Sequence, residues 1–285
     1  MLSKSNKEKL AFWVFRILSF FVLAILFWIL EFIFIRGWHM LNWEFLTEMP
    51  KDGMTKGGIY PAIIGTLCLI AGSMIFAFPI GVLAGIYMHE YTKDSWYKRF
   101  IKLMTNNLAG IPSIVFGLFG MALFVNAMDF GDSIIAGSLT LGLLSLPVVI
   151  RVTEEAMLAV NDSFRHGSLA LGATKLQTVR KVVLPIALPN IITGLILSIG
   201  RVSGETAPIL FTVAAYFLPK LPESIFDQVM ALPYHLYVIS TSGTKIEESR
   251  DMAYGTALVL VLIVLILNLL ANMLRRYYSK KVKMN

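Results

Sequence analysis

Arg201 and Glu205 are two charged residues four positions apart within a long apolar stretch of the chain. A guanidinium is always charged, and its planar fork of N–H donors matches the oxygens of phosphate or carboxylate. If the stretch is a transmembrane helix, the two side chains share a face, and a charge at that depth is costly unless it is paired or in water. These residues alone leave two interpretations open. One is a transient anion site, in which Glu205 prevents binding that is too tight for release; the other is a structural ion pair.

Other residue types that carry chemistry form no recognisable site in the sequence. Cys68 is the single cysteine, so neither an intramolecular disulfide nor a cysteine-rich metal site is available. The four histidines match no metal-ligand spacing; they are His39, His89, His166 and His235. The sequence has no GxSxG element, no paired aspartates within an apolar segment and no GxxxxGK(S/T) phosphate loop. We therefore expect no catalytic residue, no metal site and no cofactor in this chain, which argues against an intramembrane enzyme.

The elements that must position Arg201 and Glu205 follow from composition. The 285 residues are 56% hydrophobic and 15% charged, with a mean hydropathy of +0.71, whereas soluble domains carry charge on about a quarter of their residues. The apolar residues come in blocks long enough for a membrane-spanning helix, which needs about 20 residues. We expect an all-α polytopic membrane protein with six transmembrane helices. They are predicted at roughly 17–35, 61–88, 103–126, 133–151, 186–217 and 253–274, between an N-terminal segment 1–16 and a C-terminal tail 275–285.

The basic residues predict the orientation, because lysines and arginines stay preferentially on the cytoplasmic side of a membrane. Most of the 25 lie in the N-terminal segment, in residues 89–102, in residues 151–185 and in the C-terminal tail. Both termini are therefore predicted to be cytoplasmic, and the net charge of +7 reflects topology rather than a nucleic-acid surface. Arg201 then lies roughly 24 Å along the fifth helix, past the bilayer centre. Arg151, at the cytoplasmic end of the fourth helix, is either an exit contact for an anion or an ordinary basic flank.

The cytoplasmic loop 151–185 is too long for a simple turn between two spans. Asn161 or Asp162 can cap a helix through residues 165–171, and Gly172 can end it in the left-handed conformation that glycine adopts most cheaply. A second amphipathic run, 175–183, ends where the fifth span begins. Two short helices around a glycine turn suit docking into a groove of a soluble partner. A helical surface loop without a partner remains the alternative.

The end of this loop resembles the coupling motif of the permeases of ABC importers. Gly172 is followed by nine residues and then by VVLP (182–185), similar to the family pattern G-x9-I-x-L-P. The sequence departs from the family at His166, where the motif has a glutamate. The resemblance implies that the short helices fit a cleft of the nucleotide-binding subunit and transmit its ATP-driven closure. It implies coupling roles for Arg165, His166, Gly172, Ala173, Thr174, Leu184 and Pro185.

Five further stretches, in order along the chain, resemble the A-type permease (PstA) family of phosphate-specific importers. They are GGIYPAIIGTL (57–67), NLAGIPSIVFGLFG (107–120), LPVVIRVTEEAM (146–157), LALGATKLQTVRKVVLP (169–185) and GRVSGETAPILFT (200–212). The resemblance implies a MetI-like helix bundle at 17–274 in a bacterial or archaeal cytoplasmic membrane. It also implies three partners: a second, C-type permease subunit in a heterodimer, a dimeric ATPase that binds ATP and Mg, and an extracytoplasmic phosphate-binding protein docked on 36–60 and 218–252. In that family the R-x-x-x-E pair, here Arg201 and Glu205, is assigned to transport.

Two alternatives remain at this point. A permease for another oxyanion, such as molybdate or sulfate, would use Arg201 equally well, with specificity set by the external binding protein. A channel or secondary transporter that works without ATP would need no docking loop, so the length of 151–185 argues against it.

Overall fold

The computed structural model describes residues 4–241 and 246–284. Residues 1–3 of the predicted N-terminal segment, 242–245 of the predicted outer docking segment and 285 of the tail lie outside the described residues. The regular elements of the described chain are helices, apart from a small two-stranded antiparallel sheet, and an irregular segment joins α10 to α11. In chain order the elements are α1 (Lys4–Trp38), α2 (Trp43–Thr47), β1 (Pro50–Lys51), η1 (Asp52–Met54), β2 (Lys56–Gly57), α3 (Tyr60–Ile86), η2 (Tyr87–Tyr91), α4 (Trp96–Ala109), α5 (Ser113–Gly120), η3 (Met121–Ala127), α6 (Ile134–Leu158), α7 (Asp162–Ala170), α8 (Lys175–Thr178), η4 (Val179–Val183), α9 (Leu184–Ser203), α10 (Ala207–Leu210), α11 (Leu232–Thr241) and α12 (Ile246–Met284).

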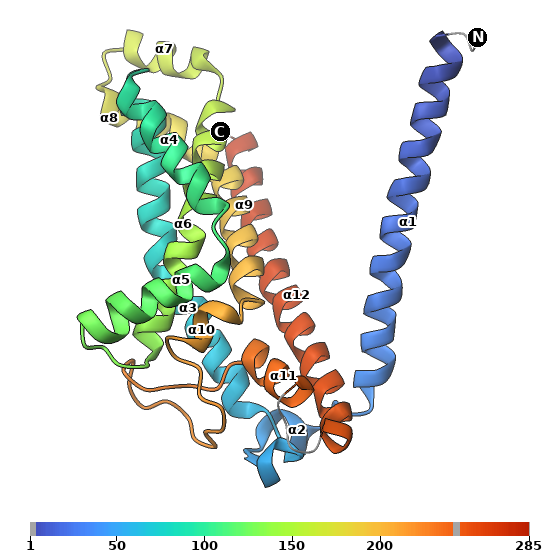
Figure 1. Ribbon diagram of the computed structural model, residues 1–285. Coiled ribbons are helices and arrows are strands. Elements are labelled where there is room, and N and C mark those ends of the chain that lie inside the picture. The colour runs from blue at the N-terminus through green and yellow to red at the C-terminus, as the bar shows by residue number, and fades with distance from the viewer. Residues whose placement is uncertain (1–3, 242–245, 285) are drawn as a thin grey trace.

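Five helical segments of the described chain are long and apolar enough to cross a membrane, and a bent pair brings the number to the predicted six when it is counted as one broken span. The five are Phe12–Trp38, Tyr60–Tyr91, Ile134–Leu158, Lys175–Ser203 and Ser249–Lys280. The first and last described residues lie at the same end of the molecule as α7, termed here the inner end (Figure 1). That this end faces the cytoplasm stays a prediction from the basic residues.

Two predicted spans have the wrong shape. The third, predicted as one helix over 103–126, is the bent pair, with Trp96–Ala109 and Ser113–Ala127 meeting at 100°. The bend lies at Gly110 and Pro112, because proline removes a helical hydrogen bond and clashes with the preceding turn. The fifth, predicted to continue to residue 217, ends at Ser203 and is continuous at its start with α8, so the second loop helix does not stop at Pro185. The π-helical turn η4 ends two residues before Pro185, and the backbone N–H of Leu184 donates to the carbonyl of Val179, five residues back.

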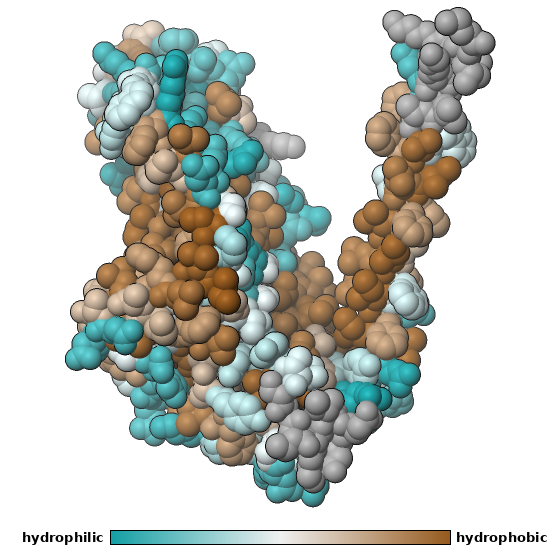
Figure 2. Space-filling view, in the orientation of Figure 1, coloured by the Kyte–Doolittle hydropathy of each residue, from teal (hydrophilic) through white to brown (hydrophobic). Residues whose placement is uncertain are grey.

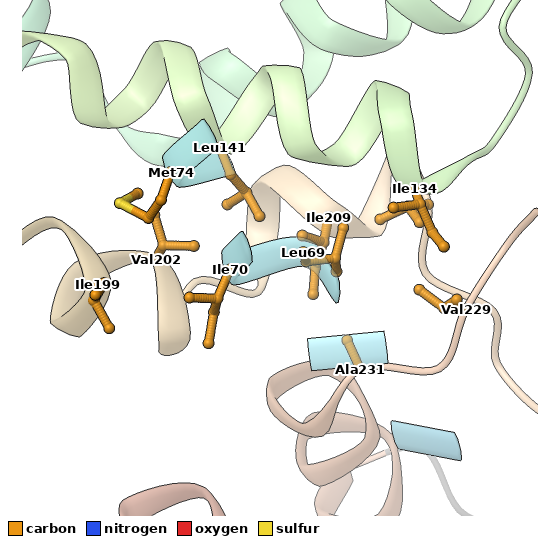
Figure 3. Packing of buried hydrophobic residues seen from close by; sticks show 11 residues of the cluster. Leu69, Ile70, Met74, Ile134, Leu141, Ile199, Val202, Ile209, Val229 and Ala231 are labelled. Carbon is orange, nitrogen blue, oxygen red and sulfur yellow. The ribbon is translucent and has the colours of Figure 1, made fainter. Parts of the chain in front are cut away.

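The core of the bundle is the packing of α3, α6 and α9. Gly81 and Gly85 of α3 allow close approach to α6, since a Cβ atom on Gly81 would lie 2.7 Å from Cβ of Val149. Toward the outer end, side chains from α3, α6, α9, α10 and the segment 229–231 converge in one buried apolar cluster (Figure 3). This cluster surrounds the point where α9 ends, so it determines where Arg201 and Glu205 lie.

Helix α1 stands apart from the bundle over most of its length and joins it only near the outer end (Figure 1). There the ring of Phe32 packs edge-on against Tyr254 of α12, with centroids 5.6 Å apart. Between Phe12 and Leu30 the side chains of α1 are exposed and mostly apolar, and Figure 2 shows hydrophobic surface along this helix. Lipid or another subunit must cover this surface.

The outer end is closed by α2, the small sheet and α11 around a second apolar cluster that includes Phe45, Met54, Met230 and Leu232. The backbone N–H of Leu232 donates to Oγ1 of Thr66 on α3 at 2.8 Å, which ties the start of α11 to the bundle. The segment 218–252 is therefore only partly available as an outer docking surface, because α11 is largely buried within it.

Candidate functional site

Arg201 and Glu205 form an ion pair, but not as two residues of one helix. Arg201 lies in the last turn of α9, and Glu205 lies in the break between α9 and α10. The helix ends with Gly204 as its C-cap, and Pro208, at the second position of α10, lacks the N–H that would bond the Gly204 carbonyl in a continuous helix. Nε of Arg201 and Oε1 of Glu205 are 3.7 Å apart, and their side chains are 32% and 18% exposed. The predicted pairing is found, and the predicted continuous helix through it is wrong.

The space beside this pair is nearly closed. Glu205 and Ser203 line a cavity of about 10 Å³ together with residues of α3, α6 and the segment before α11. A volume of this size holds about one water molecule. The site is therefore shut to an anion on the Glu205 side, while the partly exposed guanidinium of Arg201 remains accessible at the surface of the bundle.

Arg151 lies at the other end of the bundle, so the structure does not bring it together with Arg201. Its Nε donates to Oε1 of Glu155 at 3.0 Å on the exposed face of α6. Both residues line an inner cavity of about 490 Å³ between α4, α6 and η2. The other two cations of this cavity are paired too, Lys98 with Asp94 at 3.1 Å and Lys102 with Glu154 at 3.4 Å. The positive charge at the inner cavity is thus balanced by carboxylates.

The predicted coupling loop forms a short helix with a free apolar face. Asn161, rather than Asp162, caps α7, with its Oδ1 accepting from the N–H of Ser163 at 2.9 Å. Gly172 has φ +84°, which confirms the predicted left-handed turn. Leu171, beside it, is 91% exposed. A shallow groove of about 400 Å³ runs along this face, lined by Ser163, Phe164, Gly167, Ser168, Leu171, Ala173 and Val182.

The other predicted coupling residues differ in exposure: most lie at the surface of the loop, and one faces the helix bundle. Thr174 caps α8 through a reciprocal pair of hydrogen bonds with Gln177. His166 and Pro185 are exposed and Leu184 and Ala173 are half-buried. Arg165 instead turns toward the bundle, where its side chain is only 13% exposed.

The partner of Arg165 is a residue that the sequence alone does not predict. Oε1 of Glu90, in η2, accepts from Nε and Nη2 of Arg165 at 3.0 and 2.8 Å. His89 lies beside them, with Nε2 3.4 Å from Nη2 of Arg165. Glu90 lies two residues beyond the second predicted span (61–88), where a carboxylate is expected as an ordinary flank. Only its contact with Arg165, 75 positions away in the sequence, sets it apart.

Comparison with known proteins gives a family for this arrangement. Residues 77–284 match the family described as the inner membrane component of binding-protein-dependent transport systems. The chain is 35% identical over 296 residues to a probable ABC transporter permease protein, YqgI, of Bacillus subtilis, covering 100% of both chains. It is 36% identical over 262 residues to the phosphate transport system permease protein PstA 1 of Mycobacterium tuberculosis, covering 90% of this chain and 84% of that protein.

Solved structures show the same fold at low sequence identity. A chain of a bacterial alginate ABC transporter, in complex with its pentasaccharide-bound periplasmic protein, superposes with a TM-score of 0.69 at 15% identity, covering 96% of each chain. A chain of the MetNI methionine ABC transporter in an inward-facing conformation superposes with a TM-score of 0.60 at 18% identity, covering 77% of this chain and 97% of that one. These likenesses confirm the predicted ABC-permease bundle.

Proposed function

The chain belongs to the family of inner-membrane components of binding-protein-dependent transport systems, and on that premise we propose that it is the permease subunit of an ATP-driven importer of inorganic phosphate. The assignment of phosphate as the substrate rests on sequence similarity to permeases of bacteria and an archaeon that are named for phosphate transport. The similarity covers most of this chain and most of each relative. The same similarity favours phosphate over molybdate or sulfate. The chain is a multi-pass protein of the cytoplasmic membrane.

Arg201 binds phosphate transiently as the anion crosses the outer half of the membrane. Its fork donates two hydrogen bonds to phosphate oxygens, and Glu205 keeps the empty site close to neutral. A carboxylate 3.7 Å from the guanidinium also competes with the anion, so that phosphate binds weakly enough to leave. The nearly closed cavity beside Glu205 corresponds to a conformation in which this passage is shut.

Arg151 provides a second, weaker contact near the exit. It is exposed and already paired with Glu155, so an anion leaving through the inner cavity meets a positive charge that does not hold it.

ATP hydrolysis belongs to a separate dimeric subunit that binds ATP and Mg, and α7 is the surface on which it docks. The exposed Leu171 and the groove around Phe164 and Gly167 supply an apolar face for a cleft of that partner. His166 stands exposed on the same helix at the position of the family's glutamate. Docking here relies on shape and apolar contact, with no carboxylate at this position.

Two further partners complete the importer. A second, C-type permease subunit covers part of the apolar surface of this chain, of which α1 exposes the most. A phosphate-binding protein docks at the outer end on the accessible parts of 36–60 and 218–252. It selects phosphate before the anion reaches Arg201.

Uptake by the complete importer tests this function. The four components are reconstituted in vesicles, and ATP-dependent uptake of radiolabelled phosphate, sulfate and molybdate is compared. We expect the vesicles to take up phosphate, and we expect excess sulfate or molybdate not to reduce that uptake. Uptake of sulfate or molybdate in place of phosphate would keep the importer and overturn the substrate.

A further inference from the structure

Arg165 joins the docking helix α7 to the inner end of α6. Its Nη1 donates to the carbonyl of Val160 and its Nη2 to the carbonyl of Met157, both at 2.7 Å. These carbonyls lie at and just beyond the end of α6, at Leu158, where a carbonyl no longer has the N–H of the residue four positions on as its partner; that of Met157 also accepts from the N–H of Val160 at 3.3 Å. A cation at this end is also favourable for the helix dipole. One side chain of α7 thus holds the end of a transmembrane helix.

The same guanidinium holds the end of α3. Glu90 lies in η2, directly after α3, and its side chain is only 7% exposed. Burying a carboxylate is costly unless it is paired and hydrogen-bonded. Capping α6 needs Arg165 alone, so the presence of buried Glu90 requires another explanation. What the pair adds is a charge-assisted link between α7 and α3.

The position of this link suits the transfer of motion. The face of α7 that carries Leu171 is free, while Arg165 on the same helix faces the bundle. A second link connects α7 to the start of the fifth span, where Oγ of Ser168 and Oγ1 of Thr178 are 2.9 Å apart. These contacts connect α7 to three transmembrane helices, to α3 and α6 through Arg165 and to α9 through Ser168.

We propose that Arg165 and Glu90 form a strut that makes α7 move as one body with the inner ends of α3 and α6. This inference rests on the proposed function and adds a positioning pair to it: neither residue touches the substrate, and neither is needed for ATP hydrolysis itself. Without the carboxylate of Glu90, α7 keeps its peptide connection to α6, the bonds from Arg165 to the α6 carbonyls and its packing against η4, and loses its charge-assisted link to the end of α3. ATP-driven movement of α7 then no longer carries the inner end of α3 with it.

The test is the amount of phosphate transported per ATP hydrolysed by the complete importer carrying Glu90→Gln. Glutamine keeps the shape and removes the charge. We expect phosphate uptake to fall about tenfold while ATP hydrolysis stays within about twofold of wild type. Asp162→Asn is the matched control, because Oδ1 of Asp162 also accepts from Arg165, at 3.0 Å, but from within α7 itself. This variant should keep the wild-type ratio.

Three outcomes would overturn the strut. One is an unchanged ratio in Glu90→Gln, and another is a loss of uptake and hydrolysis in equal proportion. If Glu90→Gln does not assemble with the ATPase, Arg165→Lys, which keeps the charge and loses the fork, is measured by the same criterion. The third outcome is failure of both variants to assemble, which would mean that the pair serves folding rather than coupling. A wild-type importer that takes up sulfate or molybdate contradicts only the proposed substrate, and the ratio is then measured with that anion.

Discussion

Replacing Glu205 with glutamine separates the transport interpretation of the Arg201–Glu205 pair from the structural one. Glutamine has nearly the same shape as glutamate and removes its charge, so Arg201 loses its counter-ion and little packing changes. If Arg201 binds phosphate in passage, the anion should then bind more tightly and leave more slowly. If the pair only fixes the end of α9, the substitution should lower stability and leave transport by the folded protein unchanged.

The size of the effect follows from the geometry of the pair. Two unit charges 3.7 Å apart attract by about 4 kcal/mol at an effective dielectric constant of about 20. Arg201 is one-third exposed, and measured values for exposed pairs are at most about 1 kcal/mol because of solvent screening. A value of about 1–2 kcal/mol is therefore reasonable for this partly buried pair. This corresponds to about 5- to 30-fold tighter binding of the anion.

The assay is the maximal rate of phosphate uptake in vesicles with a saturating amount of phosphate-loaded binding protein. We expect Glu205→Gln to lower this rate about 5- to 30-fold if anion release limits it. Asp162→Asn is the control, because Asp162 also pairs with an arginine, with Oδ1 3.0 Å from Nη1 of Arg165, but its side chain is 78% exposed and lies outside the proposed passage. It should leave the rate unchanged. A maximal rate equal to wild type for Glu205→Gln, with a lower thermal midpoint, would refute the transport interpretation.

Three further substitutions test other parts of the molecule: the link between α3 and α11, the docking face of α7 and the turn at Asp227. Thr66→Val leaves the buried N–H of Leu232 without its acceptor, so the free energy of unfolding should fall by about 1–3 kcal/mol; an unchanged thermal midpoint in detergent would contradict this. Leu171→Asp places a charge on the docking face of α7, and the amount of ATPase that co-purifies should fall about tenfold, corresponding to about 1.4 kcal/mol; undiminished co-purification would exclude docking there. The backbone N–H groups of Glu223 and Ser224 donate to the carboxylate of Asp227 and lower the pKa of that carboxyl group. This turn should therefore resist proteolysis at pH values above 3.8, the ordinary pKa of aspartate, and lose that protection as the pH falls through the lowered pKa. Asp227→Ala should show the loss at neutral pH.

The number of spans could be predicted because it depends on the length of apolar segments, which a single sequence displays directly. Their shapes could not. Proline in a membrane helix predicts a kink, but packing of the neighbouring helices decides between a slight kink and the 100° bend at Pro112. Likewise, Gly204 and Pro208 are visible in the sequence, yet the end of α9 at Ser203 depends on how the segment 204–231 packs back against α3 and α6.

The candidate site was predictable to a similar degree. Arg201 and Glu205 are conspicuous because charge is rare within an apolar stretch, and their spacing places them together whether or not the helix continues. Arg165 could be assigned to the coupling loop from the motif around it. Its direction could not, because a basic residue in a cytoplasmic loop is expected at the surface. The structure turns it inward to Glu90, and no spacing rule connects residues 75 positions apart.

The central claim is that phosphate crosses the membrane by way of Arg201. Its most direct test compares ATP-dependent phosphate uptake by the complete importer containing wild-type, Arg201→Lys or Arg201→Gln permease, at equal amounts of assembled complex. We expect uptake to be lost in Arg201→Gln and strongly reduced in Arg201→Lys, because lysine keeps the charge but cannot offer the fork. Full uptake by Arg201→Gln would contradict the claim.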